Sequence, residues 1–171
     1  MVEYNKITNQ EFEIVKRFGK RSNILFGVEV PMLIYMPYRF VKIDLPDLLS
    51  EGNIQELIEL ICNQRNIEKK ETKTSDIISF ILWITDEFEA IQKLEQHHLS
   101  SAPDPDMIAA GSSELSQLGE INVIDQLAGG DILKWELVEQ LPYHKVFDKL
   151  KKTTVENKVN KAYQQIISKK K

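Results

Sequence analysis

The stretch from Ile121 to Leu150 constrains the fold most, because it holds the only Gly-Gly pair of the chain and a proline between two apolar segments. Gly129 and Gly130 can adopt positive φ angles without steric cost, so they predict the end of one helix. Asp131 can accept a hydrogen bond from the free amide groups that begin the next helix. Pro142 cannot continue that helix because it lacks an N–H group. The stretch therefore predicts two short helices that meet at an angle.

Apolar side chains recur at helical spacing on both sides of Pro142. The helix expected before it has two apolar sides, which predict burial between two neighbouring elements. These sides consist of Ile132, Trp135 and Val138 and of Leu133, Leu137 and Leu141. The helix expected after Pro142 has one apolar face, made of Tyr143, Val146, Phe147 and Leu150. Two interpretations remain open: an ordinary part of the core, or a docking wedge anchored by Trp135 and Tyr143, since these residue types concentrate at interface centres.

Length and composition bound the class of protein. A chain of 171 residues makes one large domain or two small ones. Its 42% hydrophobic residues can fill a core and exclude disorder throughout. Cys62 is the only cysteine, which excludes a disulfide framework and indicates a reducing compartment. The polar, acidic N-terminus is unlike a secretory signal, and the longest apolar run, Ile77–Ile84, is too short to span a membrane.

Charge is unevenly distributed along the chain. Residues 151–171 contain seven lysines and one glutamate, whereas residues 1–150 carry 15 basic and 25 acidic side chains. A basic end on an acidic body predicts a partner, and the simplest partner is the acidic body of a neighbouring copy. Nucleic acid is an alternative, but Tyr163 is the lone aromatic residue of the lysine-rich end. That composition supports non-specific phosphate contact at most.

The first half of the chain predicts helices around one short β element. Residues 8–18 predict a first helix. Residues 23–45 contain three short runs rich in β-branched and aromatic residues, separated by prolines, which predict a β-hairpin or a three-stranded meander. One helical turn is expected at residues 46–49, and a clearer helix begins after Asn53. The longest helix is expected from about Ser75 to His97, where apolar residues recur every three or four positions.

The second half begins with SSAPDPD at residues 100–106, the best candidate for a linker. It would separate an N-terminal part, residues 1–99, from a C-terminal part, residues 107–171. Residues 107–110 and 113–118 predict short helices. The fold class is therefore mainly α (α+β), a helical bundle with a small β-hairpin or meander near residues 23–45.

The chain should end in an amphipathic helix. Thr153 and Glu156 have the spacing of a capping box and predict its start. Its apolar stripe comprises Val155, Val159, Ala162, Tyr163, Ile166 and Ile167. This stripe needs a partner surface.

No motif of known chemistry stands out. The phosphate-binding and hydrolase motifs GxxxxGK[ST], GxGxxG and GxSxG are absent. His144 precedes Asp148 by four residues, but no serine or cysteine stands in a recognisable relation to it. His97 and His98 are adjacent, so they point to different helix faces and make no metal site by themselves. We expect a protein that is not an enzyme, with no catalytic, cofactor-binding or metal-binding residues and no small-molecule substrate.

One segment resembles known proteins. The run from Gly130 to Glu136, followed by Leu141-Pro142-Tyr143 and Val146-Phe147, resembles a recurring segment in small tailed-bacteriophage proteins, including tail-assembly chaperones and minor neck or tail components. The likeness covers roughly residues 107–150, and its motif carries no chemistry. It implies a virion structural protein, a neck or tail ring component that contacts its own copies and other phage structural proteins.

Two alternatives accompany that expectation. One is a tail-assembly chaperone absent from the mature virion, and the other is a cytosolic adaptor with weak nucleic-acid contact. The expected location is the virion, after assembly in the host cytoplasm, with no membrane contact. The residues expected to make contacts are Trp135, Leu141, Pro142, Tyr143, Phe147, Lys151, Lys152, Lys158 and Lys161.

Overall fold

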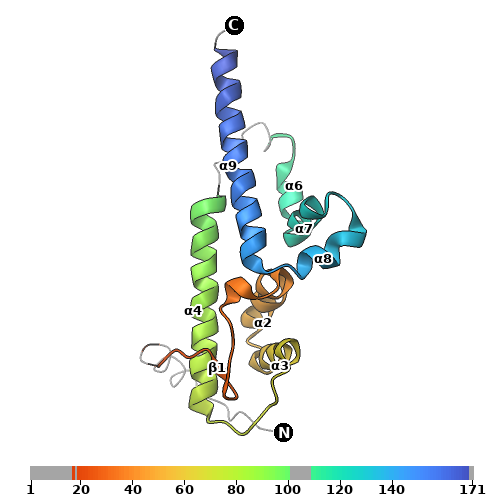
Figure 1. Cartoon of the computed structure of the whole chain (residues 1–171). Coiled ribbons are helices and arrows are strands. Elements are labelled where there is room, and N and C mark those ends of the chain that lie inside the picture. Colours follow the sequence, from red (N-terminus) through yellow and green to blue (C-terminus); the bar gives the residue numbers. More distant parts are fainter. Residues whose placement is uncertain (1–16, 18, 101–108, 170–171) are drawn as a thin grey trace.

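The computed structural model describes residue 17 and residues 19–100 and 109–169. The fold is mainly α-helical with one small β-hairpin, as the sequence predicts. Two long helices, α4 (Thr74–Leu99) and α9 (Tyr143–Ser168), lie side by side over part of their length and form the long axis of the molecule (Figure 1). Shorter helices pack along this axis, and α9 extends past the end of α4. The helix expected at residues 8–18 lies outside the described residues apart from Arg17.

The β element is a two-residue hairpin. Strand β1 (Ile24–Leu25) pairs antiparallel with β2 (Val28–Glu29), with Leu25 opposite Val28. Phe26 and Gly27 connect the strands, and both have positive φ angles, 52° and 82°. Two consecutive positive φ angles match the twist of a tight hairpin. The hairpin prediction is therefore confirmed.

The three-stranded meander is wrong, because the second and third apolar runs are helical. The second run forms η1 (Leu33–Tyr35), and the third forms a π-helical segment, η2 (Phe40–Asp44), that continues into α2 (Leu45–Glu51). The wide turns lie directly before Pro46, which has no N–H to donate to the Lys42 carbonyl four residues back. The Leu45 amide donates to the Phe40 carbonyl, five residues back. Short apolar runs buried on most sides do not distinguish strand from helix by periodicity.

The predictions for the next two helices are confirmed. Helix α3 (Ile54–Arg65) begins at Asn53, whose side chain accepts a hydrogen bond from the Glu56 amide at 3.3 Å. This contact satisfies an amide that the first helical turn leaves free. Helix α4 spans Thr74–Leu99 and includes the whole predicted range. Ser100 follows it in extended conformation, and the rest of the expected linker lies outside the described residues.

A small helical lobe precedes α9. It consists of α6 (Ser112–Ser116), α7 (Glu120–Ala128), η3 (Ile132–Lys134) and α8 (Trp135–Glu139), and we call it the α6–α8 lobe. Gly129 ends α7 with a φ of 72°, and the Asp131 carboxylate accepts a hydrogen bond from the Leu133 amide at 3.1 Å. The stop and the cap are as the sequence predicts. Helix α8 is shorter than expected, because its first turn is the 3-10 segment η3.

The final helix does not begin at Thr153. Helix α9 runs without a break from Tyr143, so the second short helix and the final helix of the sequence prediction are one element. The Thr153 hydroxyl donates to the Lys149 carbonyl at 3.0 Å, four residues back within the helix. A threonine that forms this bond inside a helix does not cap one. The capping-box prediction at Thr153 is therefore wrong.

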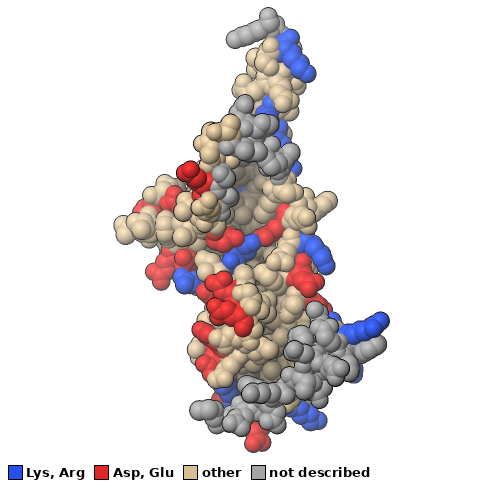
Figure 2. Space-filling model, turned by 180° about the vertical axis from the view of Figure 1, so that it is seen from behind, with Lys and Arg blue, Asp and Glu red and all other residues tan. Residues whose placement is uncertain are grey.

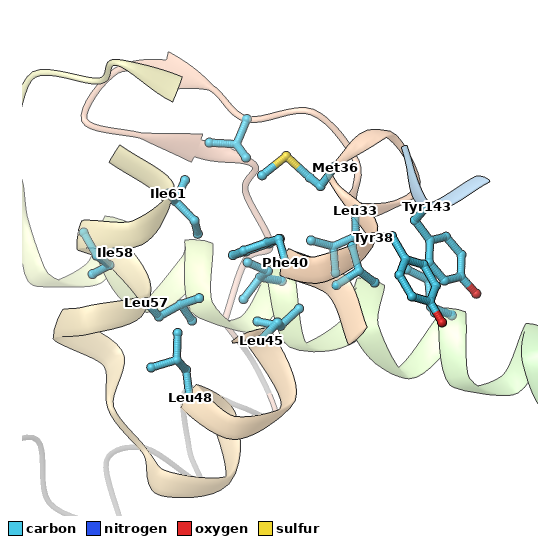
Figure 3. Packing of buried hydrophobic residues seen from close by; sticks show 14 of the residues in the cluster. Leu33, Met36, Tyr38, Phe40, Leu45, Leu48, Leu57, Ile58, Ile61 and Tyr143 are labelled. Atoms are coloured by element: carbon cyan, nitrogen blue, oxygen red, sulfur yellow. The ribbon is translucent and has the colours of Figure 1, made fainter. Parts of the chain in front are cut away.

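One hydrophobic cluster joins the hairpin, the short N-terminal helices, α4 and the start of α9. Figure 3 shows Phe40, Leu45 and Leu57 pointing toward one another, with Tyr38 and Tyr143 side by side at the edge. The cluster includes residues that precede and residues that follow residues 100–106. The cluster ends where α9 leaves the other helices. Every described residue from Val155 onward is exposed.

Candidate interaction surface

Two tyrosines, two glutamates and a lysine form a part-buried polar group where α9 begins. We call Tyr38, Lys42, Glu95, Glu120 and Tyr143 the tyrosine–lysine cluster. The Tyr143 hydroxyl donates to Glu95 Oε1 at 2.9 Å, and the Tyr38 hydroxyl donates to Glu120. Lys42 Nζ lies 2.7 Å from Glu95 Oε2 and 3.3 Å from Glu120 Oε1. The cluster thus connects the π-helical segment, α4, α7 and α9.

Electrostatics keeps this cluster in one protonation state. Burial, with the nearby Glu120 carboxylate, raises the pKa of the Tyr38 hydroxyl well above its ordinary value. Burial and Glu95 do the same for the pKa of Tyr143. Burial opposes the charge of Lys42, but its two carboxylate partners outweigh it and raise the pKa of the ammonium group. At neutral pH the two phenols are therefore neutral and the lysine is charged. These are the protonation states that the hydrogen bonds and ion pairs of the cluster require.

A second set of contacts fixes α8 to the segment before α2. Arg39 Nη1 lies 2.9 Å from Glu139 Oε2, and Arg39 Nε lies 3.4 Å from Asp44 Oδ1. The hydrogen bond to Glu139 is the main reason that the pKa of Arg39 is raised. Together with the Tyr38–Glu120 bond, this ion pair holds the α6–α8 lobe at two points.

The backbone around Pro142 is also tied down. The Tyr38 amide donates to the Leu141 carbonyl at 2.8 Å, and the Tyr143 amide donates to the Met36 carbonyl at 2.9 Å. Pro37 and Pro142 form an isolated antiparallel bridge between these bonds. The start of α9 is thereby paired with the N-terminal half of the chain.

The contact residues expected from the sequence separate into core and surface positions. Tyr143 is 1% exposed and Phe147 is buried, so both pack in the core instead of presenting a docking surface. Trp135 is half-buried, and its indole N–H donates to Asp125 at 3.1 Å. Leu141 is 40% exposed beside the half-buried Pro142. Apart from the lysines, only Leu141, Pro142 and part of Trp135 are accessible among the residues expected to make contacts.

The lysines of α9 lie outside the core. Lys152, Lys158 and Lys161 are exposed, and Lys151 is half-buried. Lys152 forms an ion pair of 3.1 Å with Glu156, one helical turn away. Burial lowers the pKa of His98 on the adjacent α4, and the positive charge of Lys151 lowers it further.

The α6–α8 lobe exposes an apolar surface. Leu133 is 86% exposed, and Ile132 and Leu137 are exposed beside it in sequence. The sequence prediction that this helix is buried between two neighbours is therefore wrong. Only Val138 is buried in η3 and α8, because the core covers one side of this segment. Further exposed apolar side chains of the lobe are Leu115, Leu118 and Ile121.

The far end of α9 exposes a second apolar surface. The predicted stripe is helical, but nothing in the described part of the chain covers it. Its exposed members are Val155, Val159, Ala162, Tyr163, Ile166 and Ile167, and we call them the α9 stripe. Figure 2 shows this end of the helix projecting from the body, with lysines along it and acidic side chains over the lobe.

The histidines and the cysteine do not converge. His144 Nδ1 lies 3.0 Å from the Ile34 carbonyl, and its ring meets Tyr35 edge-on at 5.4 Å. Cys62 is buried, which raises the pKa of its thiol. Within the described ranges, no group of three or more His, Cys, Asp or Glu side chains could hold a metal ion. None of the described helices is long and apolar enough to cross a membrane.

A cleft of about 670 Å³ lies at the opposite end of the molecule from the α9 stripe. Lys20, Arg21, Lys70 and Asp76 are among its lining residues, together with the hairpin turn. Arg21 is engaged by Asp86 at 2.8 Å. The cleft brings together none of the residues expected to make contacts.

No protein-family model, curated protein or solved structure matches the chain. The surfaces therefore have to be judged by their own chemistry. Sequence reasoning found the α9 stripe from its periodicity, but it missed the exposure of Leu133 and Leu137. It also missed the tyrosine–lysine cluster, whose bonded partners are 48, 53 and 82 positions apart.

Proposed function

We propose that this protein is a non-enzymatic structural component of a bacteriophage virion, in the neck or tail, that works through protein–protein contacts. The observation that carries the proposal is the uncovered α9 stripe. Scattered apolar side chains are ordinary on a protein surface, but apolar patches on one face of a projecting element mark interaction sites.

The energetics of α9 support a partner. From Val155 to Ser168 the helix makes no contact with the described part of the chain that buries a side chain. Helices gain most of their stability from packing an amphipathic face, and short isolated helical segments are marginal in water. Burying a side chain such as Ile166 or Val159 contributes about 1.5–3 kcal/mol. Covering the stripe would therefore stabilise both the contact and the helix itself.

The fixed base of α9 supports a structural role. The tyrosine–lysine cluster and the backbone pairing at Pro142 set the direction in which the helix leaves the body. A projecting helix with a rigid base presents its apolar face in one orientation. This suits a repeated contact in an assembly, where each subunit has to meet its neighbour at the same angle.

The phage setting comes from the resemblance of residues 107–150, which covers the lobe and the start of α9. Mass spectrometry of purified particles of the phage that encodes the chain tests it. We expect the chain in mature particles at a constant ratio to the other structural proteins. Its absence from mature particles would overturn the structural role.

The tail-assembly chaperone is the second candidate, because exposed apolar helix surfaces also suit transient binding. In that case the chain would be missing from particles and would instead co-purify with another phage protein from infected cells. The variant V159E/I166E should abolish that capture. N157E/Q164E, which adds the same two charges away from the stripe, should preserve it.

A further inference from the structure

We propose that the α9 stripe of one copy docks on the exposed apolar surface of the α6–α8 lobe of the next copy, head to tail. This inference rests on the proposed function and names the contact through which copies would assemble. Both surfaces are uncovered by the residues that the structure describes, and they carry opposite charge.

The two apolar faces of α9 lie on different sides of the helix. Near its start, Tyr143, Val146 and Phe147 face the core. At 3.6 residues per turn, the centre of the α9 stripe lies roughly half a turn away from that face. The core of the same chain therefore does not continue along the stripe. A separate body has to approach from the other side.

Charge selects among the possible occupants. Beyond Leu150, α9 and the residue that follows it contain Lys151, Lys152, Lys158, Lys161 and Lys169 against Glu156. The α6–α8 lobe contains Glu114, Asp125, Asp131 and Glu136 against Lys134. Its two other acidic side chains, Glu120 and Glu139, pair with Lys42 and Arg39 of the body. Pairing α9 with α9 opposes two basic surfaces, and pairing lobe with lobe opposes two acidic ones. Only the pairing of α9 with the lobe brings complementary charge together.

The same chain cannot satisfy this pairing by folding back. The lobe is held to the body by the Tyr38–Glu120 bond and by the Arg39–Glu139 ion pair. The helix α9 runs unbroken past it. The contact must form between copies, and a contact between two different surfaces repeats to give a closed ring or an open filament.

Two variants, each with one of the two surfaces disabled, test the contact. V159E/I166E disables the stripe and leaves the lobe intact, whereas L133E/L137E disables the lobe and leaves the stripe intact. All four positions are exposed, so the fold is expected to survive, and circular dichroism would verify it. Each variant alone should lose self-association by at least about a hundredfold, since two apolar side chains leave the interface.

An equimolar mixture of the two variants decides the pairing. In head-to-tail docking, the intact stripe of L133E/L137E can still bind the intact lobe of V159E/I166E, and no other contact remains. Sedimentation velocity should therefore show a 1:1 complex and nothing larger. Self-association of L133E/L137E alone would indicate pairing of α9 with α9 and overturn the proposal. Self-association of V159E/I166E alone would indicate pairing of lobe with lobe and would also overturn the proposal. A mixture in which both variants stay monomeric would overturn it as well, because the intact stripe and the intact lobe would then fail to bind each other.

Matched controls carry the same added charge at exposed polar positions. N157E/Q164E lies on the side of α9 away from the stripe, and Q117E/Q126E lies at exposed polar positions of the lobe. Both should assemble like the unaltered protein to within a few-fold. A monomeric unaltered protein at all concentrations would end this inference. The virion proposal would stand if particles still contain the chain.

Discussion

The rings of Tyr38 and Tyr143 stack with 6.4 Å between their centroids and 8° between their planes, although more than 100 residues separate them in the chain. Each hydroxyl donates to a different glutamate, and Lys42 contacts both carboxylates. The pair therefore joins the N-terminal half to the start of α9 through apolar and polar contacts at once.

Removing the Tyr143 hydroxyl should destabilise the protein moderately. Y143F deletes the hydrogen bond to Glu95 but keeps the ring, so the free energy of unfolding should fall by about 1–2 kcal/mol. Y143A also removes the ring and should cost about 3–5 kcal/mol. Urea denaturation measures both. Y35F, at an exposed position outside the proposed docking surfaces, is the control and should be neutral. Equal losses for Y143F and Y35F would contradict the role of the cluster.

Lys42 should matter more than either hydroxyl. K42M leaves Glu95 and Glu120 close together without their shared cation, and removing one partner of a buried pair costs about 3–5 kcal/mol. The Lys42 side chain is 17% exposed, so we expect a loss nearer the lower value. The triple change K42M/E95Q/E120Q should recover much of that loss, because it removes the repulsion. A double-mutant cycle in urea that shows no coupling between Lys42 and Glu95 would refute the arrangement.

Stability should fall in alkaline solution. The pKa values of Tyr38 and Tyr143 are raised on folding above their ordinary value of 10.0, so the folded state retains protons that the unfolded state loses. This contribution is complete below pH 10 and is lost as the pH rises above it. The raised pKa of Lys42 acts in the same direction, beginning above 10.5. Thermal unfolding between pH 8 and pH 11 should show the loss, and Y38F/Y143F should reduce its slope.

The glycine that ends α7 should resist substitution for a backbone reason alone. Gly129 has a φ of 72°, and a Cβ built there meets nothing within 4 Å. G129A should therefore cost about 1 kcal/mol through backbone strain, with no steric clash to add. An alanine at Gln126, a helical position three residues earlier, is the comparison and should be near neutral. A neutral G129A in chemical denaturation would be inconsistent with the observed turn.

The far half of α9 should be dynamic until it is covered. In the monomeric variant V159E/I166E, amide hydrogens beyond Thr154 should exchange far faster than those of Ile81 or Ile84 in the buried part of α4. In the assembled protein the same amides should become protected. Hydrogen exchange read by mass spectrometry resolves the two segments. Equal protection in both states would mean that assembly leaves this helix uncovered.

Local signals in the sequence predict much of the fold. The Asn53 cap, the glycine stop at Gly129 and the Asp131 cap are contacts within a few residues, so their spacing identifies them. The residues of η1 and η2 were predicted as strands because their burial on most sides comes from α3, α4 and α9, which local periodicity does not reveal. Thr153 failed as a cap because the helix already extends through it.

The candidate surface was only partly predictable. The α9 stripe follows from spacing along one helix, whereas its lack of cover depends on where the rest of the chain ends up. Tyrosine is a residue type that concentrates at interface centres, but the Tyr143 side chain is buried in the core. Only its tertiary contacts with Tyr38 and Glu95 distinguish the two roles.

The unbroken course of α9 has a mechanical consequence. Its 26 residues span about 39 Å, so a tilt of about 5° at Tyr143 displaces the tip by about 3 Å. Because the length of the helix amplifies a small tilt, the packing beneath Pro142 would govern the angle between successive subunits. Substitutions deep inside the body, far from any subunit boundary, are then the ones expected to alter the number of copies that close a circle.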